Sequence, residues 1–293
     1  MPTLRKLRYY TPSLGQSWLL VLIFVVVGSA FGSVPQLIAG FSGFQGSISI
    51  TYFFTMIPVF AFVYYKATQE HQRYEFLELA APPKIDSPSF GDLHSVLVFI
   101  LAGLATLSIS VLIDPLTSLI PMPDSIKSIL EKVLGGYSIV DTIIATIILA
   151  PLCEEFLCRG VMLRGMLEHI SPAKAIFWSA FLFALLHLNP WQAIPALFLG
   201  AFFGWLYWKT RSIRLVIFLH FVNNLAAMLL ARLLPDLPID AGLLDILPTG
   251  CYLLLYAVAL ILFAGIIILF KKKLNSIDGK KTLSAEISAD SQN

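Results

Sequence analysis

The chain has 293 residues and a formal net charge of +2; 57% of its residues are hydrophobic and only 13% are charged. Its mean hydropathy is +0.81. A soluble protein could not cover its surface with so few charges, so the composition excludes an ordinary soluble domain and indicates a multi-span membrane protein. The small net charge gives no reason to expect nucleic acid as a partner.

Eight apolar segments of roughly membrane-spanning length are predicted to be transmembrane helices, because lipid tolerates no unpaired backbone. In chain order they are Trp18–Ile38, Ile48–Tyr65, Phe90–Ile113, Ser138–Cys158, Ala175–Leu188, Trp191–Trp208, Leu215–Leu230 and Asp245–Phe270. We therefore expect an all-α fold, a polytopic membrane helical bundle. The basic residues before the first segment also fit a signal peptide, but apolar character resumes at Val34, which favours an uncleaved span.

Basic residues divide unevenly between the two sides of this arrangement. With both termini in the cytoplasm, seventeen Lys and Arg residues fall on the inner side, and the outer side receives Lys127, Lys132 and Arg232. This asymmetry follows the positive-inside rule, so it predicts cytoplasmic termini for a multi-pass protein of the cell membrane. We expect that membrane to be a bacterial inner membrane.

Four regions are expected along the chain. Residues 1–137 hold the N-terminal transmembrane helices, a cytoplasmic loop and an outer segment, in which Ile126, Ile129, Leu130 and Val133 predict a short interfacial helix. Residues 138–232 form a helical core that contains the unusual polar residues. A C-terminal transmembrane helix (233–273) and a disordered tail (274–293) follow.

Polar side chains interrupt three of the predicted spans. Glu154 and Glu155 lie on the fourth, His187 on the fifth, and His220 with Asn224 on the seventh. A charge at the middle of a membrane helix costs roughly 2.5–3.5 kcal/mol on insertion scales, so such residues rarely occur by accident.

The spacing of these residues predicts that they meet at one level of the membrane. Glu154 and His187 lie equally far along the chain from the turn that precedes Pro172. His220 follows Arg211 by nine residues, which gives it a similar depth. The pairs Glu155–Arg159, Phe183–His187 and His220–Asn224 are each four residues apart, so each pair shares one face of a helix.

This set of residues resembles the CPBP family of intramembrane proteases, also called the CAAX protease, bacteriocin-processing or Abi family. The family has the motifs EExxxR, FxxxH and HxxxN/B. They occur here in the same order as EEFLCR, FALLH and HFVNN, within roughly Ser138 to Leu230.

The resemblance implies an enzyme, an intramembrane endopeptidase acting on a membrane-associated peptide or protein in the lipid bilayer. It implies that Glu154, with His187, activates a water, and that His220 and Asn224 hydrogen-bond the oxyanion of the tetrahedral intermediate. Glu155 and Arg159 would pair along the helix and hold Glu154 in place, with Phe183 as a further supporting residue.

The question of a metal stays open at this point. Glu154, His187 and His220 would supply one carboxylate and two imidazoles, a zinc ligand set that leaves one position for water. The chain has no HExxH motif, and the family has been interpreted both as zinc-dependent and as metal-free glutamate peptidases.

Other interpretations fit parts of the pattern. A single intramembrane histidine is more often hydrogen-bonded inside a bundle than catalytic, and adjacent asparagines often join helices. An ion- or proton-coupled transporter would also place Glu and His in the membrane, although the sequence contains no inverted repeat. A non-catalytic scaffold or immunity protein with the same fold is the remaining alternative.

Overall fold

The fold is all-helical, as predicted. The computed structural model describes residues 5–43, 45–238 and 240–274, and within these ranges the chain forms helices and no strand. The tail predicted to be disordered lies outside the described residues, apart from Leu274.

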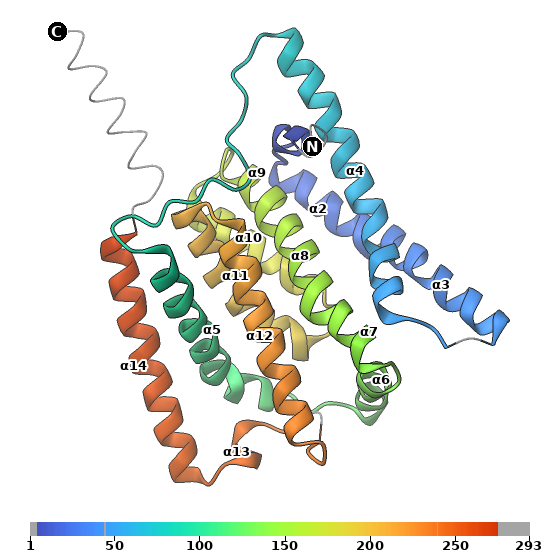
Figure 1. Cartoon of the computed structure of the whole chain (residues 1–293), viewed down its shortest axis with the longest axis vertical. Coiled ribbons are helices and arrows are strands. Elements are labelled where there is room, and N and C mark those ends of the chain that lie inside the picture. Colours follow the sequence, from blue (N-terminus) through green and yellow to red (C-terminus); the bar gives the residue numbers. More distant parts are fainter. Residues whose placement is uncertain (1–4, 44, 239, 275–293) are drawn as a thin grey trace.

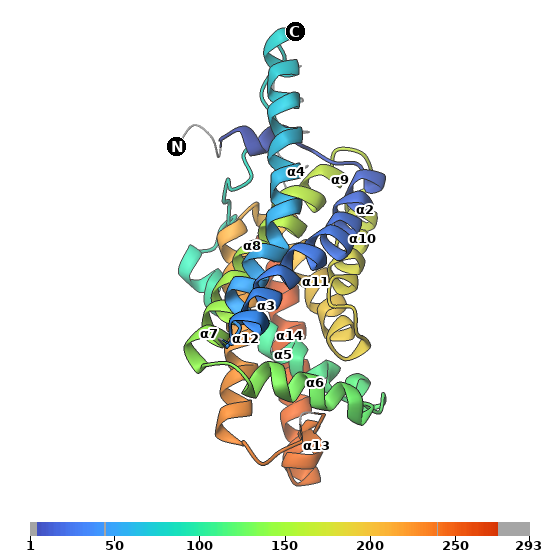
Figure 2. The ribbon, with the colours of Figure 1, turned by 90° about the vertical axis from the view of Figure 1, so that its right-hand side faces the viewer.

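The N-terminal half forms three long helical rods and two shorter helices. Its elements are η1 (Lys6–Tyr9), the continuous rod α2 (Leu14–Leu22), η2 (Ile23–Gly28) and α3 (Ser29–Ser42), then α4 (Ile48–Phe76), α5 (Ser95–Ser118) and α6 (Asp124–Gly135). Helix α4 projects beyond the rest of the bundle, and α6 runs crosswise to the long helices (Figure 2). The expected helix in the outer segment is therefore present as α6.

The C-terminal half supplies the remaining helices. One uninterrupted rod consists of α7 (Ile139–Ile143), η3 (Ile144–Leu149), α8 (Ala150–Glu155), η4 (Phe156–Leu163) and α9 (Arg164–Met166); we call it the central helix. It is followed by α10 (Pro172–Leu185), α11 (Pro190–Thr210), α12 (Ile213–Leu233), α13 (Leu243–Ile246) and α14 (Thr249–Lys273). In the central helix, η3 and η4 are π-helical.

The second part of the central helix is enclosed on all sides. Every residue from Leu157 to Met166 is buried, including two arginines. Such burial needs small residues where other segments come close. At Gly165 a Cβ atom would lie 2.4 Å from the backbone of Pro12, so only glycine allows the N-terminal segment to cross there.

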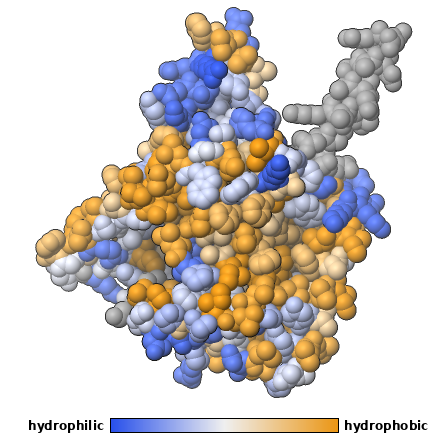
Figure 3. Space-filling view, turned by 180° about the vertical axis from the view of Figure 1, so that it is seen from behind, coloured by the Kyte–Doolittle hydropathy of each residue, from blue (hydrophilic) through white to orange (hydrophobic). Residues whose placement is uncertain are grey.

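Five helical rods are long and apolar enough to cross a membrane: Leu14–Ser42, Ile48–Phe76, Ser95–Ser118, Ile213–Leu233 and Thr249–Lys273. The other three predicted spans are also helical, as the central helix, α10 and α11. On the face drawn in Figure 3, a broad apolar band lies between hydrophilic residues at the two ends. The chain is therefore a multi-pass membrane protein.

Several predicted boundaries are wrong, and local chemistry explains the differences. The third span begins at Ser95 because a turn at Gly91, with φ of 59°, precedes the cap residue His94. The last span begins at Thr249, since Pro248 separates it from α13. The cytoplasmic loop predicted after the second span is partly helical, because α4 continues to Phe76.

The two ends of the described chain lie toward the same end of the bundle. Helix η1, α9 and the C-terminal end of α14 are all found there (Figure 1), and we call it the α9 end. At the opposite end, Lys127 of α6 forms a 2.8 Å ion pair with Asp240. This hydrogen-bonded pair raises the pKa of Lys127 and lowers that of Asp240.

Asp141 fixes the start of α4 to the start of the central helix. Its carboxylate accepts hydrogen bonds from the backbone N–H of Ile48 at 2.8 Å and of Ser49 at 3.1 Å, and from the hydroxyls of Ser47 and Ser49. The first N–H groups of a helix have no partner within it, so this carboxylate caps α4 from outside.

We predict that Asp141→Asn lowers the free energy of unfolding by about 1.5–3 kcal/mol, because hydrogen bonds to a charged acceptor are replaced by weaker ones. Denaturant titration in detergent micelles measures the change. The matched control is Asp124→Asn, in which an exposed carboxylate at the start of α6 is removed. Equal stability of the two variants would contradict this role for Asp141.

Candidate functional site

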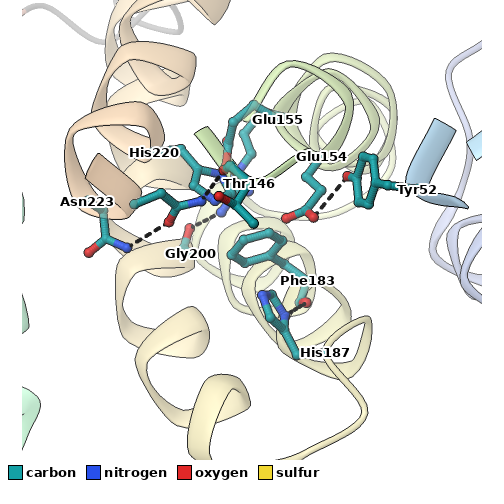
Figure 4. Close-up of polar contacts among 11 residues, drawn as sticks. Tyr52, Thr146, Glu154, Glu155, Phe183, His187, Gly200, His220 and Asn223 are labelled. Carbon is teal, nitrogen blue, oxygen red and sulfur yellow. Dashed lines mark hydrogen bonds and ion pairs between the residues drawn. The ribbon is translucent and has the colours of Figure 1, made fainter. Parts of the chain in front are cut away.

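Two of the three motifs, EExxxR and HxxxN, meet in a buried group of charges. Arg159 Nη1 donates to Glu155 Oε1 at 2.9 Å, and His220 Nδ1 lies 2.9 Å from the same oxygen. Glu155 and Arg159 are fully buried, and His220 is 6% exposed. The structure thus contains the helical Glu155–Arg159 pair that the spacing predicts, and it adds the histidine of α12 to that pair (Figure 4).

Phe183 of α10 joins this group to the remaining histidine. The Arg159 Cζ atom lies 4.5 Å from the centre of the Phe183 ring. The ring also makes edge-to-face contacts with His187 at 5.1 Å and with His220 at 5.7 Å between ring centres. One aromatic side chain therefore contacts a residue from each of the three motifs.

Gly200 of α11 completes the enclosure of Arg159. Its carbonyl accepts a 3.0 Å hydrogen bond from Arg159 Nη2. A Cβ atom at this position would lie 3.1 Å from Phe183 and 3.2 Å from Arg159 Nη2, tighter than ordinary contact. Glycine thus allows α11 to approach both groups.

Glu154 points to a different partner from that of Glu155. The Tyr52 hydroxyl of α4 donates to Glu154 Oε1 at 3.0 Å. The second carboxylate oxygen of Glu154, Oε2, is buried and has no hydrogen-bond partner among the described residues. Figure 4 shows the two neighbouring carboxylates turned toward different sides of the central helix.

His187 lies in the connection after α10 and not on the helix, so its predicted placement on a span that continues to Leu188 is wrong. Helix α10 ends at Leu185, Leu188 has a positive φ of 55°, and the Asn189 side chain caps α11 by accepting from Gln192 N. The cap and Pro190 start a new helix here, which ends α10 early. His187 Nδ1 lies 3.1 Å from the carbonyl of Phe183.

Asn224 takes part in a chain of polar contacts between helices. Ser110 of α5 donates to Asn223 Oδ1 at 3.0 Å, Asn223 Nδ2 donates to Asn224 Oδ1 at 3.1 Å, and Asn224 Nδ2 donates to the Thr146 carbonyl at 2.8 Å. These contacts join α5, α12 and η3. The Asn224 amide has two N–H groups, so one remains for a further acceptor.

The central helix is unusually wound where it carries this site. Thr146, whose carbonyl accepts from Asn224, lies in η3, and Arg159 lies in η4, both of them π-helical. Glu154 and Glu155 occupy the short α-helical turn between them. π-Helical segments inside α-helices are frequent at functional sites.

The residues proposed as zinc ligands are not arranged as a metal site. Within the described ranges, no group of three or more His, Cys, Asp or Glu side chains could hold a metal ion. Glu154 is hydrogen-bonded to Tyr52, whereas His220 is directed by Nδ1 to Glu155. This donor set does not fit zinc in the arrangement described.

Sequence reasoning missed Tyr52 and Gly200. Tyr52 lies on the second predicted span, outside the three motifs, where an aromatic residue is an ordinary component of a membrane helix. Gly200 contributes a carbonyl, which any residue possesses. Neither position carries a sequence signal that distinguishes it from its neighbours.

Comparison with known proteins gives a match to a protein family. Residues 137–226 match the family described as type II CAAX prenyl endopeptidase Rce1-like. Neither the curated proteins nor the solved structures give a match to the chain. The matched residues contain all three motifs together with Thr146 and Gly200, whereas Tyr52 and Ser110 lie outside them. The segment that builds this site, residues 137–226, is therefore similar to the Rce1-like type II CAAX prenyl endopeptidase family.

Proposed function

We propose that the protein is an intramembrane endopeptidase in which Glu154 is the general base. The similarity of residues 137–226 to the Rce1-like family supports a CAAX-type endopeptidase in general terms. The observation that carries the residue assignment is the difference between the two carboxylates. Each has a buried Oε2 atom without a partner among the described residues, but Glu155 is held by Arg159 and His220, whereas Glu154 is held only by the neutral Tyr52 hydroxyl. An unpaired carboxylate oxygen of this kind is suited to accept a proton from a water molecule.

In the proposed reaction, this water attacks the carbonyl carbon of the substrate peptide bond while its proton moves to Glu154. His187 would orient the water or the peptide from the opposite side of Phe183. The proton then passes to the nitrogen of the departing amine, and the peptide bond breaks. No step requires another reactant.

His220 and Asn224 are proposed to stabilise the negative charge that develops on the substrate oxygen. Asn224 keeps one free N–H group. With His220 Nδ1 directed to Glu155, the other ring nitrogen, Nε2, donates only when the imidazole is protonated. Donors of this kind typically contribute about 2.7–4 kcal/mol each to stabilising such a transition state. Glu155 and Arg159 would act as positioning residues.

We further propose that all eight predicted spans cross the membrane, with both termini in the cytoplasm of a bacterial inner membrane. The distribution of basic residues supports this orientation, as does the location of η1 and the C-terminal end of α14 at one end of the bundle. We propose that residues 138–232 form the catalytic core. The substrate would be a membrane-associated protein or peptide.

Glu154→Gln and His187→Ala should each lower kcat/KM by at least about 100-fold, because general-base catalysis typically contributes 10²–10⁴-fold. The measurement is cleavage of fluorogenic peptides in liposomes, with prenylated and unmodified CAAX-type sequences as separate arms. Glu131→Gln and His169→Ala, which change exposed residues outside the site, are the controls.

Equal cleavage by the wild type and Glu154→Gln would end the catalytic assignment. If neither cleaves any peptide but the wild type supports proton flux that Glu154→Gln abolishes, the transporter alternative would replace it.

Tyr52→Phe should reduce kcat about tenfold and leave KM unchanged. The variant removes one hydrogen bond to a charged group, which contributes about 1.5 kcal/mol, and about 1.4 kcal/mol corresponds to tenfold in rate. Tyr64→Phe on the same helix is the matched control. A change confined to KM would show that Tyr52 contacts the substrate and does not position Glu154.

The proposed water activation needs no metal. We expect elemental analysis of the purified protein to find less than stoichiometric zinc, and cleavage to survive dialysis against a chelator. One zinc per chain in the wild type, lost in His220→Ala, would overturn this expectation.

A further inference from the structure

Three arginines lie at the α9 end of the bundle. One of them, Arg164, is on the central helix, ten residues after Glu154. Arg164 begins α9, Arg211 lies between α11 and α12, and Arg8 lies in η1. Arg164 is 1% exposed and Arg211 is 9% exposed. The charges of Arg8 and Arg211 both act on Arg164, so the three segments bring their guanidinium groups near one another.

The hydrogen bonds of Arg164 and Arg8 go to neutral carbonyl groups, and Arg211 lies beside the Tyr207 side chain, with its Cζ atom 5.9 Å from the ring centre. Arg164 donates to Gly160 O at 2.9 Å and to Tyr10 O at 2.8 Å, and Arg8 donates to Pro82 O at 2.6 Å. The Nη1 atoms of Arg164 and Arg211 are buried without a partner among the described residues, and so is the Tyr10 hydroxyl. Donor groups therefore remain unused in the interior.

Carboxylates do not balance these charges. In the described part of the chain, none lies within ion-pair distance of the three arginines. Glu168 attracts Arg164 only from a greater distance, and Asp86 is occupied by Arg214 at 2.9 Å. The contrast is Arg159, which is equally buried and is paired with Glu155. A buried cation without a counter-charge is strongly unfavourable, so a missing anion is the simplest resolution.

The surroundings indicate which anion this is. Arg8 also lines a surface pocket of about 330 Å³ together with Arg5, Lys6, Tyr9 and His71. Arg8 therefore belongs both to the arginine group and to a surface pocket in which three of the five lining residues are Lys or Arg. Guanidinium groups bind phosphate in fixed two-pronged geometry, and several positive charges suit a phosphate group better than a single carboxylate.

We propose that Arg8, Arg164 and Arg211 form a binding site for a phosphate group, with the Tyr10 hydroxyl as an additional donor. The same chemistry is present in free phosphate and in the headgroup of an anionic phospholipid. The site is separate from the Glu154 site, so the proposal does not depend on the protease assignment.

The test is thermal unfolding of purified, lipid-depleted protein in neutral detergent. Sodium phosphate is compared with sodium chloride at equal ionic strength, and micelles containing phosphatidylglycerol are compared with micelles containing phosphatidylcholine. A ligand that binds only the folded state should raise the apparent Tm by about 5 °C at 100 times its Kd. A rise with phosphate shows that the phosphate group suffices, and a rise with phosphatidylglycerol alone identifies a lipid headgroup.

Variants separate this site from general charge effects. Arg211→Gln should abolish most of the rise in Tm, whereas Arg214→Gln should keep it, because Arg214 is exposed and paired with Asp86. If Arg211→Gln does not fold, Arg8→Gln replaces it, since Arg8 is only partly buried. The proposal fails if neither ligand stabilises the wild type, or if Arg211→Gln or its replacement responds as strongly as Arg214→Gln.

Discussion

The ion pair of Glu155 with Arg159 is the constraint on which the centre of this protein depends. Both side chains are fully buried, so removing either would leave an uncompensated charge in the interior. Their partners come from other helices: the carbonyl of Gly200 from α11, the ring of Phe183 from α10 and the imidazole of His220 from α12. These helices can move relative to the central helix only by breaking contacts to a buried charge.

This arrangement gives two adjacent carboxylates different environments. Successive residues on an α-helix are about 100° apart, so Glu154 and Glu155 cannot face the same partner. Glu155 is bound to two cationic or polar groups and serves the packing of the bundle. Glu154 faces α4, where Tyr52 holds one oxygen and leaves the other without a partner. The rigid ion pair thus fixes the backbone from which the second carboxylate projects.

The sequence predicts contacts within one helix better than contacts between helices. The pair Glu155–Arg159 follows from four-residue spacing, and the structure contains it. The Phe183–His187 contact is also present, although His187 lies just beyond the end of α10. The contact of His220 with Glu155 does not follow in this way, because residue spacing gives the depth of a side chain but not the rotation of its helix. Tyr52 was missed for the same reason.

The same difference applies to the helices themselves: their existence could be predicted from the local sequence, but some of their ends could not. Long apolar runs located all eight predicted helices, because their length and hydropathy are properties of the local sequence. The end of α10 before His187 depends on the cap and proline that begin the next helix. Arg164 is buried because the N-terminal segment covers it. The sequence around Arg164 gives no sign of this distant contact, so its burial could not be predicted.

The contact between the N-terminal segment and the central helix has a consequence for the order in which the protein folds. Tyr10 accepts a hydrogen bond from Arg164, 154 residues later in the chain, and Pro12 lies against Gly165. Since a nascent chain emerges from its N-terminus, the first segment must wait through the synthesis of half the protein before its docking surface exists. Docking of the N-terminal segment therefore cannot precede synthesis of the central helix, and a chain interrupted before that helix would leave the N-terminal segment without its binding surface.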